Sequence, residues 1–86
     1  MYRLTIIDID EYTYTLKDSE ENIYKKVFHF INTKYKPTIG DYITLPETIL
    51  NEKNIYTFGS VYKIENDDVI KIERNNDTLY LQRYYG

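Results

Sequence analysis

Short segments in which apolar and polar residues alternate, each followed by a polar turn, constrain the fold of this chain more than any other feature. The clearest is YTYTL at 12–16, where Tyr12, Tyr14 and Leu16 share one face and two threonines share the other. A period of two residues is that of a β-strand with one buried face. The 86 residues include 12 Ile and 11 Tyr but no Ala, so strand-forming residues are abundant and the best helix former is absent. We therefore expect an all-β protein.

Seven such segments can be delimited along the chain. Five precede residue 66, at 2–9, 12–16, 23–31, 41–45 and 55–65, and two follow it, at 69–74 and 78–85. A bend or bulge is expected at Asp8–Tyr12, and Gly59 predicts another inside the fifth segment. Pro46 suits the first position of a helix, so a helix of at most two turns is expected over Pro46–Glu52.

Length and composition limit the class of protein. A chain of 86 residues is expected to form one domain, here a β core over 1–65 and a C-terminal hairpin over 66–86. The absence of cysteine excludes disulfide bonds, thiolate metal sites and cysteine nucleophiles. The chain does not begin like a signal peptide, and it has no apolar run of about 18 residues. We expect a cytoplasmic protein that does not enter a membrane.

No motif indicates catalysis or a cofactor. His29 is the only histidine and lies between two phenylalanines in a predicted strand, without the ligands or nucleophile that a metal or catalytic site needs. Asp8 and Asp10 share a strand face but lack the rest of a calcium loop. The three glycines are scattered, so no phosphate-binding loop is predicted. We expect a protein that is not an enzyme and binds no metal or cofactor.

The order of the segments resembles that of the OB fold. A bent first strand, an acidic turn, the motif IGDYITL at 39–45, a short helix and a strand with a glycine follow one another between Leu4 and Ile64. This order is most similar to the small barrels of ribosomal protein S1 repeats and of bacterial translation initiation factor one. The resemblance implies a five-stranded OB-like barrel with one short helix, to which the C-terminal hairpin is additional. SH3-like barrels share the Gly40-Asp41 turn, so they remain an alternative topology.

The resemblance also implies a function. Small barrels of this kind bind single-stranded nucleic acid through aromatic and basic side chains on their middle strands. The residues at matching positions are Tyr14, Tyr24, Lys26, Phe28, Lys34, Tyr35 and Lys36. Against this stands the formal net charge of −3, with acidic and basic residues interspersed, because a nucleic-acid binder needs a basic surface.

The end of the chain suggests a different partner. In the predicted strand 78–85, Leu79, Leu81, Arg83 and Tyr85 form one face, and Tyr80, Gln82 and Tyr84 form the other. Tyrosine and arginine are favoured anchors at protein interfaces, and an exposed edge strand invites pairing. Our first hypothesis is therefore a protein-interaction or regulatory module whose contacts are Tyr80, Arg83, Tyr84 and Tyr85, with a protein or a second copy as partner. Single-stranded nucleic-acid binding is the alternative. AT-rich codons are a second explanation for the excess of tyrosine.

Overall fold

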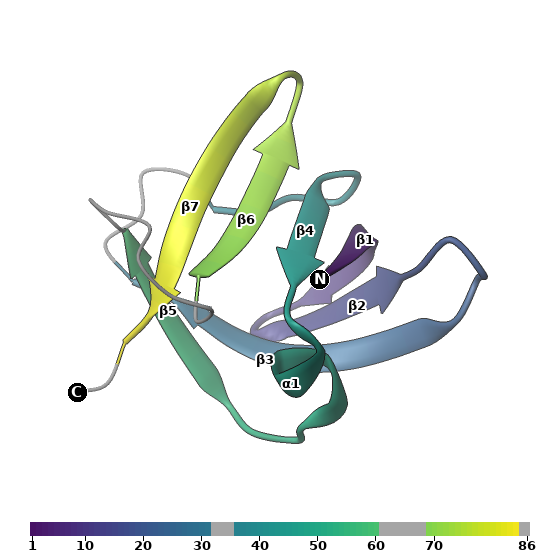
Figure 1. The fold of residues 1–86 in the computed structure, drawn as a ribbon, viewed down its shortest axis with the longest axis horizontal. Coiled ribbons are helices and arrows are strands. Elements are labelled where there is room, and N and C mark those ends of the chain that lie inside the picture. Colours follow the sequence, from purple (N-terminus) through teal and green to yellow (C-terminus); the bar gives the residue numbers. More distant parts are fainter. Residues whose placement is uncertain (32–35, 61–68, 85–86) are drawn as a thin grey trace.

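The computed structural model describes residues 1–31, 36–60 and 69–84 and shows seven strands that form a closed barrel (Figure 1). The strands are β1 (Tyr2–Asp10), β2 (Thr13–Lys17), β3 (Ile23–Phe30), β4 (Tyr42–Leu45), β5 (Tyr56–Ser60), β6 (Val69–Arg74) and β7 (Asp77–Arg83). They pair in the order β1-β2-β3-β5-β7-β6-β4, and β4 pairs with β1 to close the ring. The pair β3–β5 is parallel, and the other described pairs are antiparallel.

The predicted all-β fold with one short helix is confirmed, but the expected count of five barrel strands is not. The hairpin β6–β7 lies between β5 and β4, where it completes the ring. Ladder hydrogen bonds on both sides of each strand leave no open edge among the described strands. The hairpin that the sequence suggested as an addition is therefore part of the barrel wall.

The bend predicted at Asp8–Tyr12 divides into a bulge and a tight turn. The register of β1 against β2 shifts between Ile6 and Asp8, so that Ile7 and Asp8 are both exposed. A bulge of this kind bends its strand and increases the local twist, which helps a small sheet to close. The turn follows at Glu11, whose φ of 55° lies in the left-handed region.

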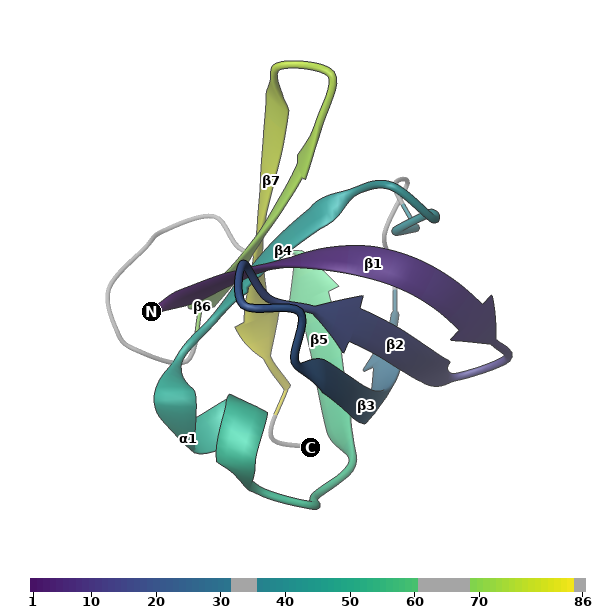
Figure 2. The same cartoon turned by 90° about the vertical axis from the view of Figure 1, so that its right-hand side faces the viewer.

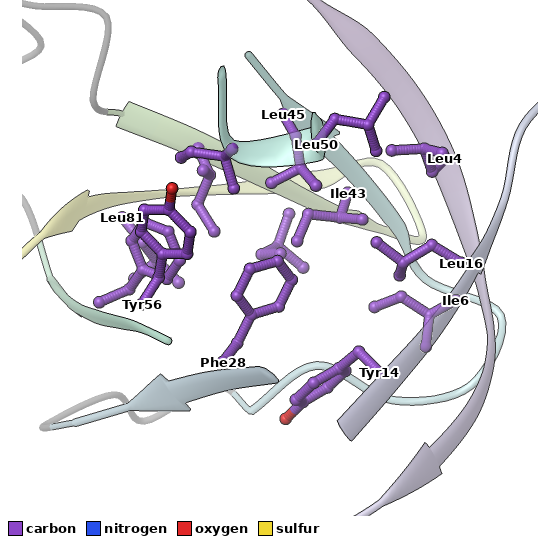
Figure 3. Packing of buried hydrophobic residues seen from close by; sticks show 14 residues of the cluster. Leu4, Ile6, Tyr14, Leu16, Phe28, Ile43, Leu45, Leu50, Tyr56 and Leu81 are labelled. Atoms are coloured by element: carbon purple, nitrogen blue, oxygen red, sulfur yellow. The ribbon is translucent and has the colours of Figure 1, made fainter. Parts of the chain in front are cut away.

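The core fills the interior of the barrel and extends under the helix α1 (Glu47–Asn51). Figure 3 shows its side chains pointing toward one another from opposite walls. Its members are Leu4, Ile6, Tyr14, Leu16, Phe28, Ile43, Leu45, Ile49, Leu50, Tyr56, Phe58, Ile70, Ile72 and Leu81. The helix begins after Pro46, as predicted, and covers the lower end of the barrel in the view of Figure 2 with Ile49 and Leu50. Each large apolar side chain buried in this way contributes about 1.5–3 kcal/mol.

The hairpin β6–β7 extends beyond the rest of the barrel (Figures 1 and 2). Its turn consists of Asn75 and Asn76, with φ of 47° and 72°. Two consecutive left-handed residues form a two-residue hairpin turn whose twist matches that of the flanking strands. Asparagine tolerates the left-handed conformation better than most residues do.

A buried ion pair fixes the loop before β4 to β6. Asp41 is only 4% exposed, and Arg74 donates to it from Nε at 2.9 Å to Oδ1 and from NH2 at 2.7 Å to Oδ2. The backbone N–H of Thr38 donates to the same carboxylate at 2.8 Å. Burial alone would raise the pKa of Asp41, but the hydrogen bonds and charge of Arg74 outweigh it, and the pKa is lowered. The ionised carboxylate therefore holds β4 in register at this end.

Candidate functional site

The aromatic residues predicted to bind nucleic acid on the middle strands lie inside the barrel. Phe28 has no exposed surface, and Tyr14 is also buried. Their rings contact each other with centroids 5.8 Å apart. Neither can stack on a base while the barrel is closed, so this part of the prediction is wrong. A period of two residues shows which side chains share a face, but it does not show which face is buried.

Lys26 also points inward, although lysine is rarely buried. Its side chain is 8% exposed, and Nζ donates to the backbone oxygen of Glu52 at 2.6 Å, next to the last turn of α1. Burial lowers the pKa of Lys26, and the charge of the Glu52 carboxylate partly opposes this effect. The same carboxylate accepts a hydrogen bond from the hydroxyl of Tyr56. Lys26 therefore ties the helix to β3 and is not available for a phosphate.

The other residues of that prediction do not converge. Tyr24 is half-buried, and its hydroxyl donates to Asp18 at 3.4 Å in the turn between β2 and β3. Lys36 is exposed on the loop before β4, where its carbonyl oxygen accepts from Arg74. Lys34 and Tyr35 lie outside the described residues. The described members thus belong to the core, the barrel end, the start of β3 and the loop before β4.

The C-terminal residues predicted to bind a protein fall on two sides of β7. Tyr80 and Tyr84 are exposed on the outside, as their alternation indicates. Arg83 is on the inner side, with its guanidinium 4.6 Å from the centre of the Tyr56 ring. Tyr85 lies outside the described residues. The expected exposed edge is wrong, because β7 pairs with both β5 and β6.

The outer wall over β3, β5 and β7 brings together residues from distant parts of the sequence. His29 is paired with Thr57 across β3 and β5, and Gly59 is paired with Gln82 across β5 and β7. The backbone N–H of Tyr84 donates to the oxygen of Thr57 at 2.7 Å. Ile31 and Tyr12 extend this surface at its β3 side. We call the following set the aromatic face: Tyr12, His29, Ile31, Thr57, Gly59, Gln82 and Tyr84.

The most distinctive feature of this face is a stacked pair of rings, one from the β1–β2 turn and one from β3. The rings of Tyr12 and His29 are 4.3 Å apart between centroids, with 27° between their planes. Tyr12 reaches His29 because it lies in the turn after β1, where its backbone oxygen accepts from the N–H of Phe28 at 3.0 Å. Tyr12 is 56% exposed and Tyr84 is 59% exposed. Two large rings on a rigid sheet are therefore available to a partner.

The aromatic face contains no Asp, Glu, Lys or Arg, although 29% of the chain is charged. Acidic residues begin at its border, since Asp10 is paired with Thr13 and Thr13 is paired with Val27 on β3. The wall thus has an uncharged centre and an acidic margin. Uncharged centres that carry aromatic rings are typical of protein interfaces.

Sequence reasoning missed the two residues at this centre. Alternation grouped Tyr12 with the inward Tyr14, but the left-handed Glu11 turns the chain before β2 begins and places the Tyr12 ring outside. His29 was considered only as a metal ligand or catalytic base, and it lacked the neighbouring residues that either role needs. Neighbouring residues of a strand point to opposite faces, so His29 must point outward if Phe28 points inward. This signal becomes informative only when the buried face is known.

A second outer surface, over β1, β4 and β6, carries both charges and rings. The guanidinium of Arg3 lies 3.9 Å from the centre of the Tyr42 ring. Glu73 Oε1 lies 3.5 Å from Arg3 Nε and 3.6 Å from Lys71 Nζ, so the two cations share one carboxylate. These three charged groups carry a net charge of +1.

The described residues include no group of three or more His, Asp or Glu side chains that could hold a metal ion. In the same part of the chain, no helix has the length and apolar character needed to cross a membrane. Models of protein families, curated proteins and solved structures were each compared with the chain, and none matched. The geometry of the outer wall is therefore the basis for inferring a function.

Proposed function

We propose that this protein is a non-enzymatic binding module that docks a protein partner on the aromatic face. One observation carries the proposal. Five neighbouring outward residues without a formal charge accompany two tyrosines that are each more than half exposed. Removing such a surface from water leaves no charge unpaired, and tyrosine provides a large contact with few rotatable bonds to immobilise.

The shape of the face supports the same function. Gly59 lies between Thr57 and Gln82 without a side chain of its own. A methyl group at Gly59 would meet Ile31 at 3.8 Å, an ordinary contact, so packing does not demand a glycine there. Gly59 therefore contributes only backbone to the face, and it has no side chain that would hinder the approach of a partner.

We include the OB-like architecture in this proposal. It is supported by the short helix, the bulged first strand and a closed ring of strands that contains one parallel pair, β3–β5. OB folds bind their ligands on the second and third strands and on the loop between the first two. His29 is on β3 and Tyr12 is in the β1–β2 turn, so the aromatic face includes the corresponding region.

Single-stranded nucleic-acid binding is the second candidate, now on a different surface from the one that the sequence predicted. Arg3, Tyr42, Lys71 and Tyr80 lie on adjoining outer positions of β1, β4, β6 and β7. Rings interleaved with cations can stack on bases and neutralise phosphates. The shared Glu73 and the net charge of −3 weaken this surface, so it ranks second.

Photo-crosslinking distinguishes the two candidates. The aromatic residue p-benzoylphenylalanine replaces Tyr12, Tyr84 or, as the matched control on the second surface, Tyr42. Each variant is irradiated in an extract of cells that express the protein. We expect adducts from positions 12 and 84 whose size nuclease does not change, and none from position 42. Adducts from position 42 alone, removed by nuclease, would overturn the proposal in favour of nucleic acid, and equal adducts from all three would also count against it.

A further inference from the structure

We propose that the partner presents an extended basic segment, with one arginine or lysine against the Tyr12 ring and its neighbours beside Asp8, Asp10 and Glu11. The inference rests on the proposed function and names the chemistry of the partner. The uncharged face supplies the contact area, and the charge at its margin selects what can lie there.

The margin of the aromatic face carries three acids, and no described residue forms an ion pair with them. Asp8 is paired with Thr15 and Asp10 with Thr13, which places both carboxylates on the outer wall, and Glu11 follows in the turn. All three residues are exposed or partly exposed. No ion pair or side-chain hydrogen bond joins them to any residue that the structure describes.

Other carboxylates of this protein do have partners in the fold. Asp41 accepts from Arg74, Glu52 accepts from Tyr56 and Asn54, and Glu73 lies beside Arg3 and Lys71. The acids of the β1–β2 hairpin differ from these three, because no side chain that the structure describes donates a hydrogen bond to them or forms an ion pair with them. Their charge is free to attract a basic partner and to orient it on the face.

The rings of this protein already show how an arginine would bind. Arg3 lies over Tyr42, and Arg83 lies over Tyr56. Tyr12 has one side of its ring against His29 and more than half of its surface exposed. A cation from outside can take the place at Tyr12 that an internal arginine takes at Tyr42.

The spacing of the acids fits an extended chain. Asp8 and Asp10 are two residues apart on one strand face, or about 7 Å. Basic residues at alternate positions of an extended segment repeat at about the same distance. Lys25 lies in the same cross-strand row as Asp8, with Thr15 between them, about 10 Å away at the usual strand spacing. With one lysine at that distance, the three acids still exceed the neighbouring bases by two.

The test is a titration of the ¹⁵N-labelled protein, followed by amide chemical shifts. The probe is the capped peptide Gly-Arg-Gly-Arg-Gly-Arg-Gly, and the matched peptide has glutamate in place of arginine. We expect shifts concentrated at 8–13 and 27–29 and a smaller response from residues of β4 and β6. The glutamate peptide should cause none.

Variants show whether the site is specific. Asp8→Asn/Asp10→Asn should weaken binding of the arginine peptide about tenfold, and Tyr12→Ala should weaken it about threefold. The matched control is Glu20→Gln/Glu21→Gln, which removes two exposed acids from the β2–β3 turn and should leave binding within about twofold. The spectrum of each variant reports whether its fold is retained, and Tyr12→Phe provides a milder change of the ring that should keep most of the affinity.

Four outcomes would overturn the inference. In the titration, these are no shifts at millimolar peptide and shifts centred away from the β1–β2 hairpin. Among the variants, it is a loss of binding in the Glu20/Glu21 control equal to that of Asp8→Asn/Asp10→Asn. The fourth is dimerisation of the protein alone that Tyr12→Ala abolishes, because a second copy would then be the occupant. Protein adducts at positions 12 and 84 without binding of the arginine peptide would reject the basic segment and keep the proposed function. Binding of the arginine peptide without any such adducts would keep the site for a basic segment and reject the proposed function.

Discussion

Lys25 and Lys26 are neighbours in the sequence and lie on opposite sides of the barrel wall. Lys25 is exposed to solvent, whereas Lys26 is buried and donates to the oxygen of Glu52. Phe28 and His29, also neighbours on β3, repeat the contrast. Phe28 is in the core, and His29 is stacked against Tyr12 on the outside. The comparison shows that the side of the wall, and not the residue type, decides whether a side chain of β3 stabilises the fold or is available to a partner.

Replacing an inward residue should have the largest effect. Phe28→Ala removes a ring that contacts Tyr14, Phe30 and Phe58, and it leaves a cavity in the barrel. We expect the free energy of unfolding to fall by about 3–5 kcal/mol, measured by urea denaturation. The outward neighbour provides the control, since His29→Ala should cost less than about 1 kcal/mol. Similar losses for both would mean that the two faces of β3 are not distinct.

The next effect concerns a buried charge that has a charged partner. Arg74→Met leaves the carboxylate of Asp41 buried with only Thr38 to hydrogen-bond it. We expect a loss of about 2–4 kcal/mol, toward the low end of the range for breaking buried pairs because Arg74 is partly exposed. In Asp41→Asn/Arg74→Met the stranded charge is absent, and at least half of the loss should be recovered.

The same pair gives a pH dependence. The pKa of Asp41 is lowered in the folded protein, so its contribution to stability is complete above the pKa of an unfolded aspartate, about 3.9, and is lost as the pH falls through the folded pKa. Urea midpoints between pH 2 and 6 should therefore decline more steeply for the wild type than for the Asp41→Asn/Arg74→Met variant. Parallel curves would show that the ion pair does not contribute to acid sensitivity.

A smaller effect, of opposite sign, is expected at Lys26. Its partners are a backbone carbonyl and a more distant carboxylate charge, so its desolvation is less well compensated than that of Asp41. Lys26→Met should be within about 1 kcal/mol of the wild type, on the stabilising side. Because the pKa of Lys26 is lowered in the fold, the wild type should gain on the variant as the pH rises toward about 10.4, where the unfolded lysine loses its proton. Denaturation at pH 7 and pH 9.5 measures both quantities, and a clear destabilisation by methionine at pH 7 would contradict this account of Lys26.

The smallest effect should come from the outward lysine. Lys25→Ala removes an exposed side chain that takes part in no ion pair among the described residues. We expect a change in the free energy of unfolding within about 0.5 kcal/mol, measured as for the other variants. A change greater than 1 kcal/mol would show that the outer face of β3 also supports the fold.

Much of the local structure could be predicted from the sequence because it depends on neighbouring residues. Alternation located the strands, Pro46 located the start of the helix, and the polar NND at 75–77 located the last turn. Within regular strands, alternation also grouped the residues into two faces correctly, as Leu79 and Leu81 show on β7. It failed at the β1 bulge and at Tyr12, where the chain departs from a regular strand. The seven predicted segments correspond to the seven strands, although β5 is described only to Ser60.

The candidate site could not be predicted in this way. Its residues come from the β1–β2 turn, β3, β5 and β7, and they meet because β3 pairs in parallel with β5 and β5 pairs with β7. Those pairings join segments that are far apart in the sequence, where no local pattern indicates a partner. The residues predicted as contacts on β2 and β3 were taken from the faces that became the core.

The sequence by itself determined a small all-β protein with a short helix, the division of each strand into two faces, and the turns that end the strands, since these follow from the preferences of residues close together. Only the tertiary structure decided which face is buried, how the ring closes, and that Tyr12 meets His29 on the outside. The physical reason is that burial is a property of the whole barrel. Each strand can place either face inward until the other strands enclose the larger apolar set.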